Sequence, residues 1–157
     1  MEPSFEKLLD LLAKAGIRFV VVGGIAVTLQ GYVRLTEDID LLVDSDAGNV
    51  SRLLEVLGTY GEGFAKELGL EDFTEEEGAI RIVEETEQCQ IDIFTVMSGL
   101  RYSDVISSAD RHLVNGRPFS YASKATLIAW KERSVREKDQ LDAMALRKLT
   151  HDPRAFD

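Results

Sequence analysis

The chain contains a single cysteine, Cys89, among its 157 residues. One cysteine cannot form an internal disulfide, so the sequence excludes a disulfide-framed secreted domain and suits a reducing compartment. No apolar run reaches the roughly 18 residues that a membrane-spanning helix needs. The first residues lack the basic-then-apolar pattern of a secretory signal. We therefore expect a cytoplasmic protein with no membrane partner.

Basic side chains are also scarce, because 18 Lys and Arg residues stand against 28 Asp and Glu residues, which gives a net charge of −10. An acidic chain repels the phosphate backbone, so non-specific nucleic-acid binding is disfavoured. Residues 1–110 carry 8 basic and 22 acidic side chains, whereas residues 111–157 carry 10 basic and 6 acidic ones. The locally basic C-terminal part remains able to contact a triphosphate or an RNA end.

Hydrophobic periodicity predicts helices alternating with strands. Helical spacing of apolar residues predicts helices at 5–15, 25–29, 46–57, 102–108, 123–133 and 137–149. Runs of β-branched and aromatic residues predict strands at 17–22, 39–43, 79–83 and 90–96, and a hairpin at 112–121 that turns at Asn115-Gly116. The stretch 58–79 has few apolar anchors and is expected to be a loop with room for one short helix. We predict one α/β (α+β) domain over residues 1–157 with a mixed sheet. Its core covers about 1–110, and a hairpin and two helices follow over about 111–150.

Acidic residues interrupt two of the predicted strands, in segments 38–41 (Asp-Ile-Asp-Leu) and 91–94 (Ile-Asp-Ile-Phe). Side chains alternate along a strand, so Asp38 and Asp40 share one face, with their Cα atoms about 6.5–7 Å apart. Asp92 also lies between core residues and faces away from them. Carboxylates beside a core are costly unless something binds them. Together they could hold divalent cations against a nucleoside triphosphate, although either acid of the first segment could instead only cap a strand end or loop.

A glycine pair, Gly23-Gly24, follows the first predicted strand and precedes a short predicted helix. Glycine at such a place lets the backbone approach a phosphate closely. The alternative is a plain tight turn. Order and spacing favour the phosphate interpretation, because thirteen residues separate Gly24 from Asp38 and a third acid follows on a later strand.

These features resemble the nucleotidyltransferase superfamily related to DNA polymerase β. Its signature is a Gly-Gly or Gly-Ser pair, a gap of about a dozen residues, an Asp-apolar-Asp-apolar motif and a third carboxylate on a later strand. The stretches 22–27 and 31–40 look closest to a small bacterial branch of minimal nucleotidyltransferases and abortive-infection toxin-like proteins. A looser match runs from Ala122 to Asp142, and the resemblance covers most of the chain except residues 44–88.

The resemblance implies metal-dependent transfer of a nucleoside monophosphate from an NTP to a hydroxyl-bearing acceptor, which is a small molecule, a tRNA or a protein. It implies that Asp38, Asp40 and Asp92 are catalytic and hold Mg²⁺ as two ions, with Mn²⁺ as the alternative. Asp92 would also help to deprotonate the acceptor hydroxyl. The nucleotide-binding residues that it implies are Gly23, Gly24, Arg34, Thr36 and Lys131.

Two alternatives stay open at this point. Larger relatives carry an added helical domain that helps bind the acceptor, so a protein partner, a homodimer or the 58–79 loop would take that role here. The chain could also be a non-catalytic nucleotide-binding module of a toxin–antitoxin-type pair. The presence of all three acids favours the enzyme.

Overall fold

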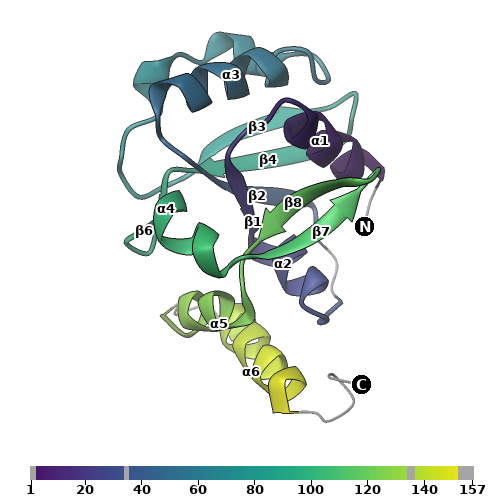
Figure 1. The fold of residues 1–157 in the computed structure, drawn as a ribbon, viewed down its shortest axis with the longest axis vertical. Helices are drawn as coiled ribbons and strands as arrows, with labels where there is room; N and C mark the ends of the chain where they lie inside the picture. The colour runs from purple at the N-terminus through teal and green to yellow at the C-terminus, as the bar shows by residue number, and fades with distance from the viewer. Residues whose placement is uncertain (1–2, 34–35, 134–136, 152–157) are drawn as a thin grey trace.

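The computed structural model describes residues 3–33, 36–133 and 137–151 (Figure 1). The α-helices are α1 (Pro3–Lys14), α2 (Gly23–Leu29), α3 (Ala47–Leu57), α4 (Tyr102–Val105), α5 (Lys124–Arg133) and α6 (Glu137–His151). Three single-turn 3-10 helices are η1 (Phe64–Glu67), η2 (Leu70–Asp72) and η3 (Ile106–Ser108). The strands are β1 (Phe19–Val22), β2 (Asp38–Val43), β3 (Ile80–Glu84), β4 (Cys89–Phe94), β5 (Val96–Met97), β6 (Leu100–Arg101), β7 (Asp110–Val114) and β8 (Arg117–Tyr121).

Six of the strands form one mixed sheet in the order β3-β4-β2-β1-β8-β7. Strand β1 runs antiparallel to β2 and parallel to β8, and β2 runs parallel to β4. The two hairpins β3–β4 and β7–β8 are antiparallel and form the ends of the sheet. Strands β5 and β6 pair separately as a small hairpin. The architecture confirms the predicted α/β class with a mixed sheet.

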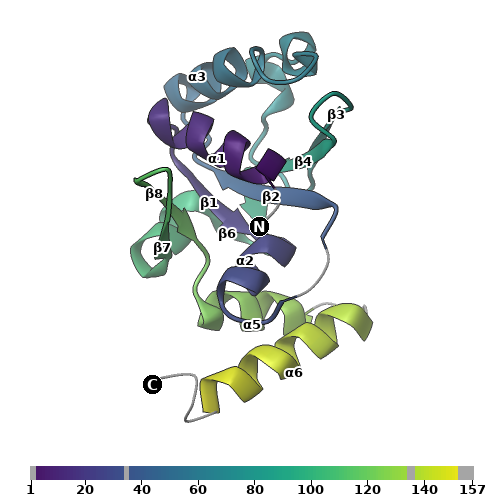
Figure 2. The ribbon, with the colours of Figure 1, turned by 90° about the vertical axis from the view of Figure 1, so that its right-hand side faces the viewer.

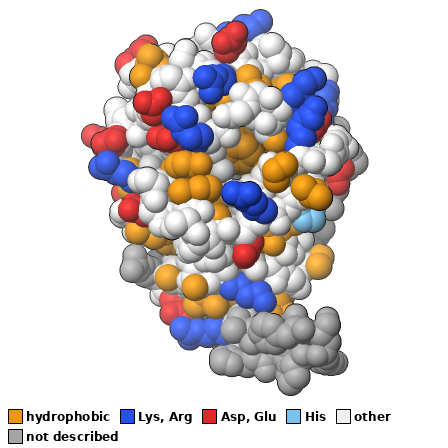
Figure 3. All heavy atoms as spheres, in the orientation of Figure 1, with side chains coloured by type: hydrophobic (Ala, Val, Ile, Leu, Met, Phe, Trp, Pro, Cys, Tyr) orange, Lys and Arg blue, Asp and Glu red, His pale blue; other side chains and the backbone are white. Residues whose placement is uncertain are grey.

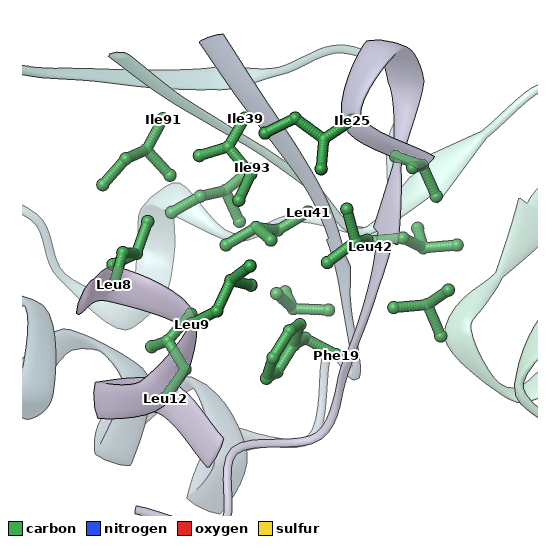
Figure 4. Close-up of a cluster of buried hydrophobic side chains, with 14 of the residues drawn as sticks. Leu8, Leu9, Leu12, Phe19, Ile25, Ile39, Leu41, Leu42, Ile91 and Ile93 are labelled. Atoms are coloured by element: carbon green, nitrogen blue, oxygen red, sulfur yellow. The ribbon is translucent and has the colours of Figure 1, made fainter. Parts of the chain in front are cut away.

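Helices cover the sheet on two sides. The two ribbon views place α1 and α3 on one side and α2, α5 and α6 on the other (Figures 1 and 2). The apolar stripe of α1 packs against the strands, and Figure 4 shows its leucines on the same side as the inward-facing strand residues. These buried side chains are Leu8, Leu9, Leu12, Ile39, Leu41, Ile91 and Ile93. Because side chains alternate along a strand, the acids of β2 and β4 face the opposite side, where α2 lies.

Most predicted elements form within a few residues of their expected bounds. The glycine pair differs, because it was expected to precede the short helix at 25–29, whereas α2 begins at Gly23. The 58–79 stretch holds two 3-10 turns, and the β5–β6 hairpin was not predicted. The predicted hairpin near the C-terminus joins the main sheet, since β8 pairs with β1.

Within the described ranges, no helix is both long and apolar enough to cross a membrane. On the face drawn in Figure 3, the Lys and Arg side chains of the described residues lie singly among apolar and acidic ones and do not gather into one basic patch. Surfaces that bind a nucleic-acid backbone cluster their basic side chains, so this face lacks that pattern among the residues described.

Asn49 on α3 ties its helix to the ends of β1 and β2 and is only 1% exposed. Its Nδ2 donates to the carbonyl oxygens of Arg18 at 3.1 Å and Asp44 at 2.9 Å. Its Oδ1 accepts the backbone N–H of Arg18 at 2.8 Å. These bonds connect the helix to the segment that leads into β1 and to the segment that leaves β2.

We expect Asn49→Ala to lower the free energy of unfolding by about 2–4 kcal/mol, because each lost hydrogen bond contributes about 1 kcal/mol and its partners are part-buried. Urea denaturation followed by circular dichroism measures the change. Ser51→Ala, at an exposed position of the same helix, is the control and should change it by less than about 0.5 kcal/mol. Equal effects of the two substitutions would contradict this assignment.

Candidate active site

The structure brings the three sequence-predicted acids together. Strands β2 and β4 are parallel neighbours, and their register places Asp40 opposite Asp92. One carboxylate oxygen from each of Asp38, Asp40 and Asp92 lies within 4.8 Å of the others. Carboxylate oxygens are the hard ligands that Mg²⁺ prefers, so this donor set fits a divalent cation.

The carboxylates are crowded, and the crowding changes their electrostatics. Burial, followed by the hydrogen bond and negative charge of Asp92, raises the pKa of Asp38 above its ordinary value. The Asp92 residue is only 4% exposed. Like charges in a poorly solvated place destabilise one another, and a bound cation relieves that repulsion.

Gly23 lies against the acids at the end of β1. Its φ is +69°, in the left-handed region that glycine adopts without strain. A Cβ atom at this position would lie 1.9 Å from Oδ2 of Asp40. The close approach therefore requires glycine for two independent reasons. Gly24 follows it in the first turn of α2 and is half-buried.

The remaining predicted site residues are Thr36, Lys131 and Arg34, and the structure describes them to different extents. The Thr36 hydroxyl donates to the carbonyl oxygen of Asp38 at 2.9 Å and lies 3.4 Å from its Oδ1, so it braces the start of β2. Lys131 lies on α5, a helix that contacts α2, but its side chain is outside the described part of the structure. Arg34 lies outside the described residues.

Arg81 is a site residue that the sequence analysis missed. It pairs with Asp92 in the β3–β4 register. Its Nε donates to Oδ1 of Asp92 at 2.9 Å and its Nη2 to Oδ2 at 3.3 Å. These bonds raise the pKa of Arg81 above its ordinary value. The available signal was the pair of consecutive predicted strands at 79–83 and 90–96, since a hairpin between them places a residue near 81 opposite residue 92.

Glu84, at the end of β3, was also missed and is 1% exposed. Its Oε2 accepts the backbone N–H of Glu62 at 2.9 Å, and its Oε1 accepts that of Phe64 at 3.1 Å. Gly61 supports this contact, because its φ is +56° and a Cβ there would lie 2.8 Å from Oε2 of Glu84. Glu84 therefore fixes the loop before η1 to the sheet edge and stands apart from the acid cluster.

Burial, followed by a hydrogen bond that the protonated Glu84 side chain donates to the Glu62 carboxylate, raises the pKa of Glu84 above its ordinary value. A raised folded-state pKa means that Glu84 stabilises the fold fully below its unfolded pKa, about 4.3, and loses that contribution as the pH rises through the folded pKa. We expect the stability of the wild type relative to Glu84→Gln to fall as the pH rises above about 4.3. Urea denaturation between about pH 4.5 and 8 measures it.

The matched control for this pH series is Glu55→Gln, at an exposed position of α3. It measures the effect of replacing a surface glutamate with glutamine, and the slope for Glu84→Gln is compared with it. A flat or rising difference for Glu84→Gln would contradict the assignment of a raised pKa to this buried carboxyl.

The chain matches one known protein family and is similar in fold to solved structures. Residues 3–154 match the family model described as nucleotidyl transferase of unknown function (DUF2204). Among curated proteins, no sequence matches. The fold is similar to that of the lincosamide antibiotic adenylyltransferase LnuA with lincomycin bound, with a TM-score of 0.62, 19% identity, and coverage of 94% of this chain and 96% of that one.

A second solved structure is an antigenic nucleotidyltransferase-like protein from Paracoccidioides brasiliensis, with a TM-score of 0.49, 19% identity, and coverage of 92% of this chain and 73% of that one. The family model spans nearly the whole chain, including the glycine pair and all three acids. The chain belongs to this nucleotidyltransferase family.

Proposed function

We propose that this chain, as one domain over residues 1–157, transfers a nucleoside monophosphate from an NTP to a hydroxyl group in a reaction that requires Mg²⁺ or Mn²⁺. The observation that supports the proposal is the cluster of Asp38, Asp40 and Asp92, whose oxygens lie within 4.8 Å of one another beside Gly23. Three carboxylates this close together, one of them only 4% exposed, are costly to maintain without a cation. Asp38, Asp40 and Asp92 would hold Mg²⁺ as a pair of ions, with Mn²⁺ as the alternative, because carboxylate oxygens are the hard ligands that such cations prefer.

Each residue has a distinct role in the proposed reaction. Gly23 and Gly24 present backbone N–H groups to the β- and γ-phosphates, and Arg34, Thr36 and Lys131 complete the nucleotide site. Bound Mg²⁺ supplies charge neutralisation and polarisation of the phosphate oxygens.

The transfer itself is a displacement at the α-phosphorus. The acceptor oxygen forms a bond to that phosphorus, and the bond from the phosphorus to the bridging oxygen of pyrophosphate breaks. Asp92 helps to remove the proton of the acceptor hydroxyl, and pyrophosphate leaves with the negative charge of the broken bond. The remaining contribution of the protein is positioning, which brings the reacting groups together in line.

The acceptor is a hydroxyl of a small molecule, a tRNA or a protein. LnuA is described as a lincosamide adenylyltransferase and holds lincomycin, so lincomycin is a suitable first small molecule to test. We further propose that a protein partner or a second copy of the chain helps to bind the acceptor, and the cell extract in the test supplies candidate protein partners.

The test is incubation of the protein with each α-labelled NTP and Mg²⁺, together with lincomycin, a tRNA pool or a cell extract. Label transfer to any acceptor that is lost in Asp92→Asn supports the proposal. Tight NTP binding with no transfer in any arm would overturn it and favour the non-catalytic module of a toxin–antitoxin-type pair.

A further inference from the structure

The guanidinium of Arg81 is hydrogen-bonded to the carboxylate of Asp92, which in the proposed reaction binds a cation. Both oxygens of Asp92 accept from it, at 2.9 Å from Nε and 3.3 Å from Nη2. The parallel and antiparallel registers place Arg81, Asp92 and Asp40 side by side across β3, β4 and β2. Arg81 therefore approaches Asp92 from the side of the sheet edge, and Asp40 approaches it from the sheet interior.

The two partners differ greatly in exposure. The Asp92 side chain is 5% exposed, whereas the Arg81 side chain is 61% exposed and stands on the edge strand of the sheet. The guanidinium itself loses little when it is released, because it is already mostly solvated. Removal of Asp92 from its partner without a substitute costs more, because a buried carboxylate would be left unpaired.

A cation that coordinates Asp92 must replace at least one of these N–H···O bonds. The guanidinium also repels a cation placed between the acids, since it lies next to them and carries the same sign of charge. Both effects act on Asp92 more strongly than on Asp38 and Asp40, because Arg81 pairs directly with Asp92, whereas the other two acids lie on β2, one strand farther from β3.

We propose that Arg81 is a positioning residue that competes with the divalent cation for Asp92, so that cations bind in order. A cation is held first by Asp38 and Asp40, and Asp92 joins the coordination only after Arg81 releases it. Until then, the two hydrogen bonds from Arg81 hold the Asp92 carboxylate in one orientation. This inference rests on the proposed function, because it concerns the same three acids.

The test measures binding of Mn²⁺ alone, by electron paramagnetic resonance, to the full chain and its variants. Arg81→Gln should bind Mn²⁺ about fivefold more tightly than the wild type, which is the upper range expected for loss of a partly exposed ion pair. Arg81→Lys keeps the charge but loses the planar fork, so an increase of about twofold is expected. The lysine variant also serves if the glutamine variant does not fold.

Two further variants separate the possible explanations. Arg18→Gln removes a comparable exposed ion pair, Nε to Oδ2 of Asp44 at 2.7 Å, at the opposite end of β1 from Gly23, and should leave Mn²⁺ affinity unchanged. Asp40→Asn should weaken Mn²⁺ binding. If Asp40→Asn has no effect, the proposed metal site itself is wrong. If Asp40→Asn weakens binding while neither Arg81 variant tightens it, only the competition by Arg81 is wrong.

Discussion

Replacement of Asp40 with asparagine is expected to reduce nucleotidyl transfer about a thousandfold, because the carboxylate charge that would hold the cation is lost and cations contribute several kcal/mol to such reactions. Asp40 is the central acid of the cluster, since it lies opposite Asp92 and against Gly23. Asparagine fills the same space, so the fold should persist. The rate of label transfer from an α-labelled NTP measures the effect, with circular dichroism as the check on folding.

The matched control is Asp44→Asn. Asp44 follows β2 directly and pairs with Arg18, at the end of that strand away from the acid cluster. This variant should transfer at a rate within about twofold of the wild type, because surface ion pairs contribute little. Retention of more than about a tenth of the activity in Asp40→Asn would remove Asp40 from the proposed cation site.

Gly23→Ala is expected to reduce transfer about a hundredfold, because misplacement of reacting groups by about 1 Å has effects of this size. A methyl group there would meet Oδ2 of Asp40 at 1.9 Å, so the carboxylate or the turn must move. The positive φ adds strain of about 1 kcal/mol for any residue other than glycine. Transfer rate and Mn²⁺ affinity should therefore fall together.

Gly16→Ala separates the effect of backbone strain at a positive φ from the effect of a steric clash between the new methyl group and Asp40. Gly16 has a φ of +71°, close to that of Gly23, yet a Cβ there would have nothing within 4 Å. This variant should lose about 1 kcal/mol of stability, measured by urea denaturation, and keep its transfer rate. Equal loss of transfer in both glycine variants would show that general destabilisation, and not contact with Asp40, explains the Gly23 effect.

The sequence predicted the acid cluster because strand periodicity is local information. Asp38 and Asp40 are two residues apart, so they share a face in any strand that contains them. Asp92 lies between two isoleucines that must point to the core, which fixes its direction as well. Proximity of the two strands could not be read from periodicity, and the resemblance to nucleotidyltransferases supplied it.

Arg81 and Glu84 were missed because their roles depend on exact pairing. A hairpin register that is wrong by one residue places a different side chain opposite Asp92 and reverses every face. Glu84 points to the same face of β3 as Ile80 and Ile82, where an apolar residue is expected. The loop that supplies its two N–H donors lies 20 to 22 residues earlier in the chain. Nothing near Glu84 in sequence indicates that loop.

The small β5–β6 hairpin illustrates a different limit. Each of its strands has two residues, too few for a periodic pattern to appear. Side-chain contacts hold it instead, since the Glu77 carboxylate accepts the backbone N–H groups of Ser98 and Gly99. Two-residue strands form because tertiary contacts hold them, so the β-propensity of their residues does not predict them.

The position of β1 in the sheet has a consequence for synthesis of the chain. Its partner on one side, β2, follows within about twenty residues, but Val20 and Val21 pair on the other side with Ser120 and Tyr121. A nascent chain can therefore assemble the acids of β2 and β4 while the far edge of β1 still exposes unpaired backbone. Such an edge recruits strands from other molecules, and long-range pairing of this kind forms slowly. Pairing of β8 with β1 is thus the step that removes this unpaired edge, and it has to wait for a hairpin about a hundred residues farther along the chain.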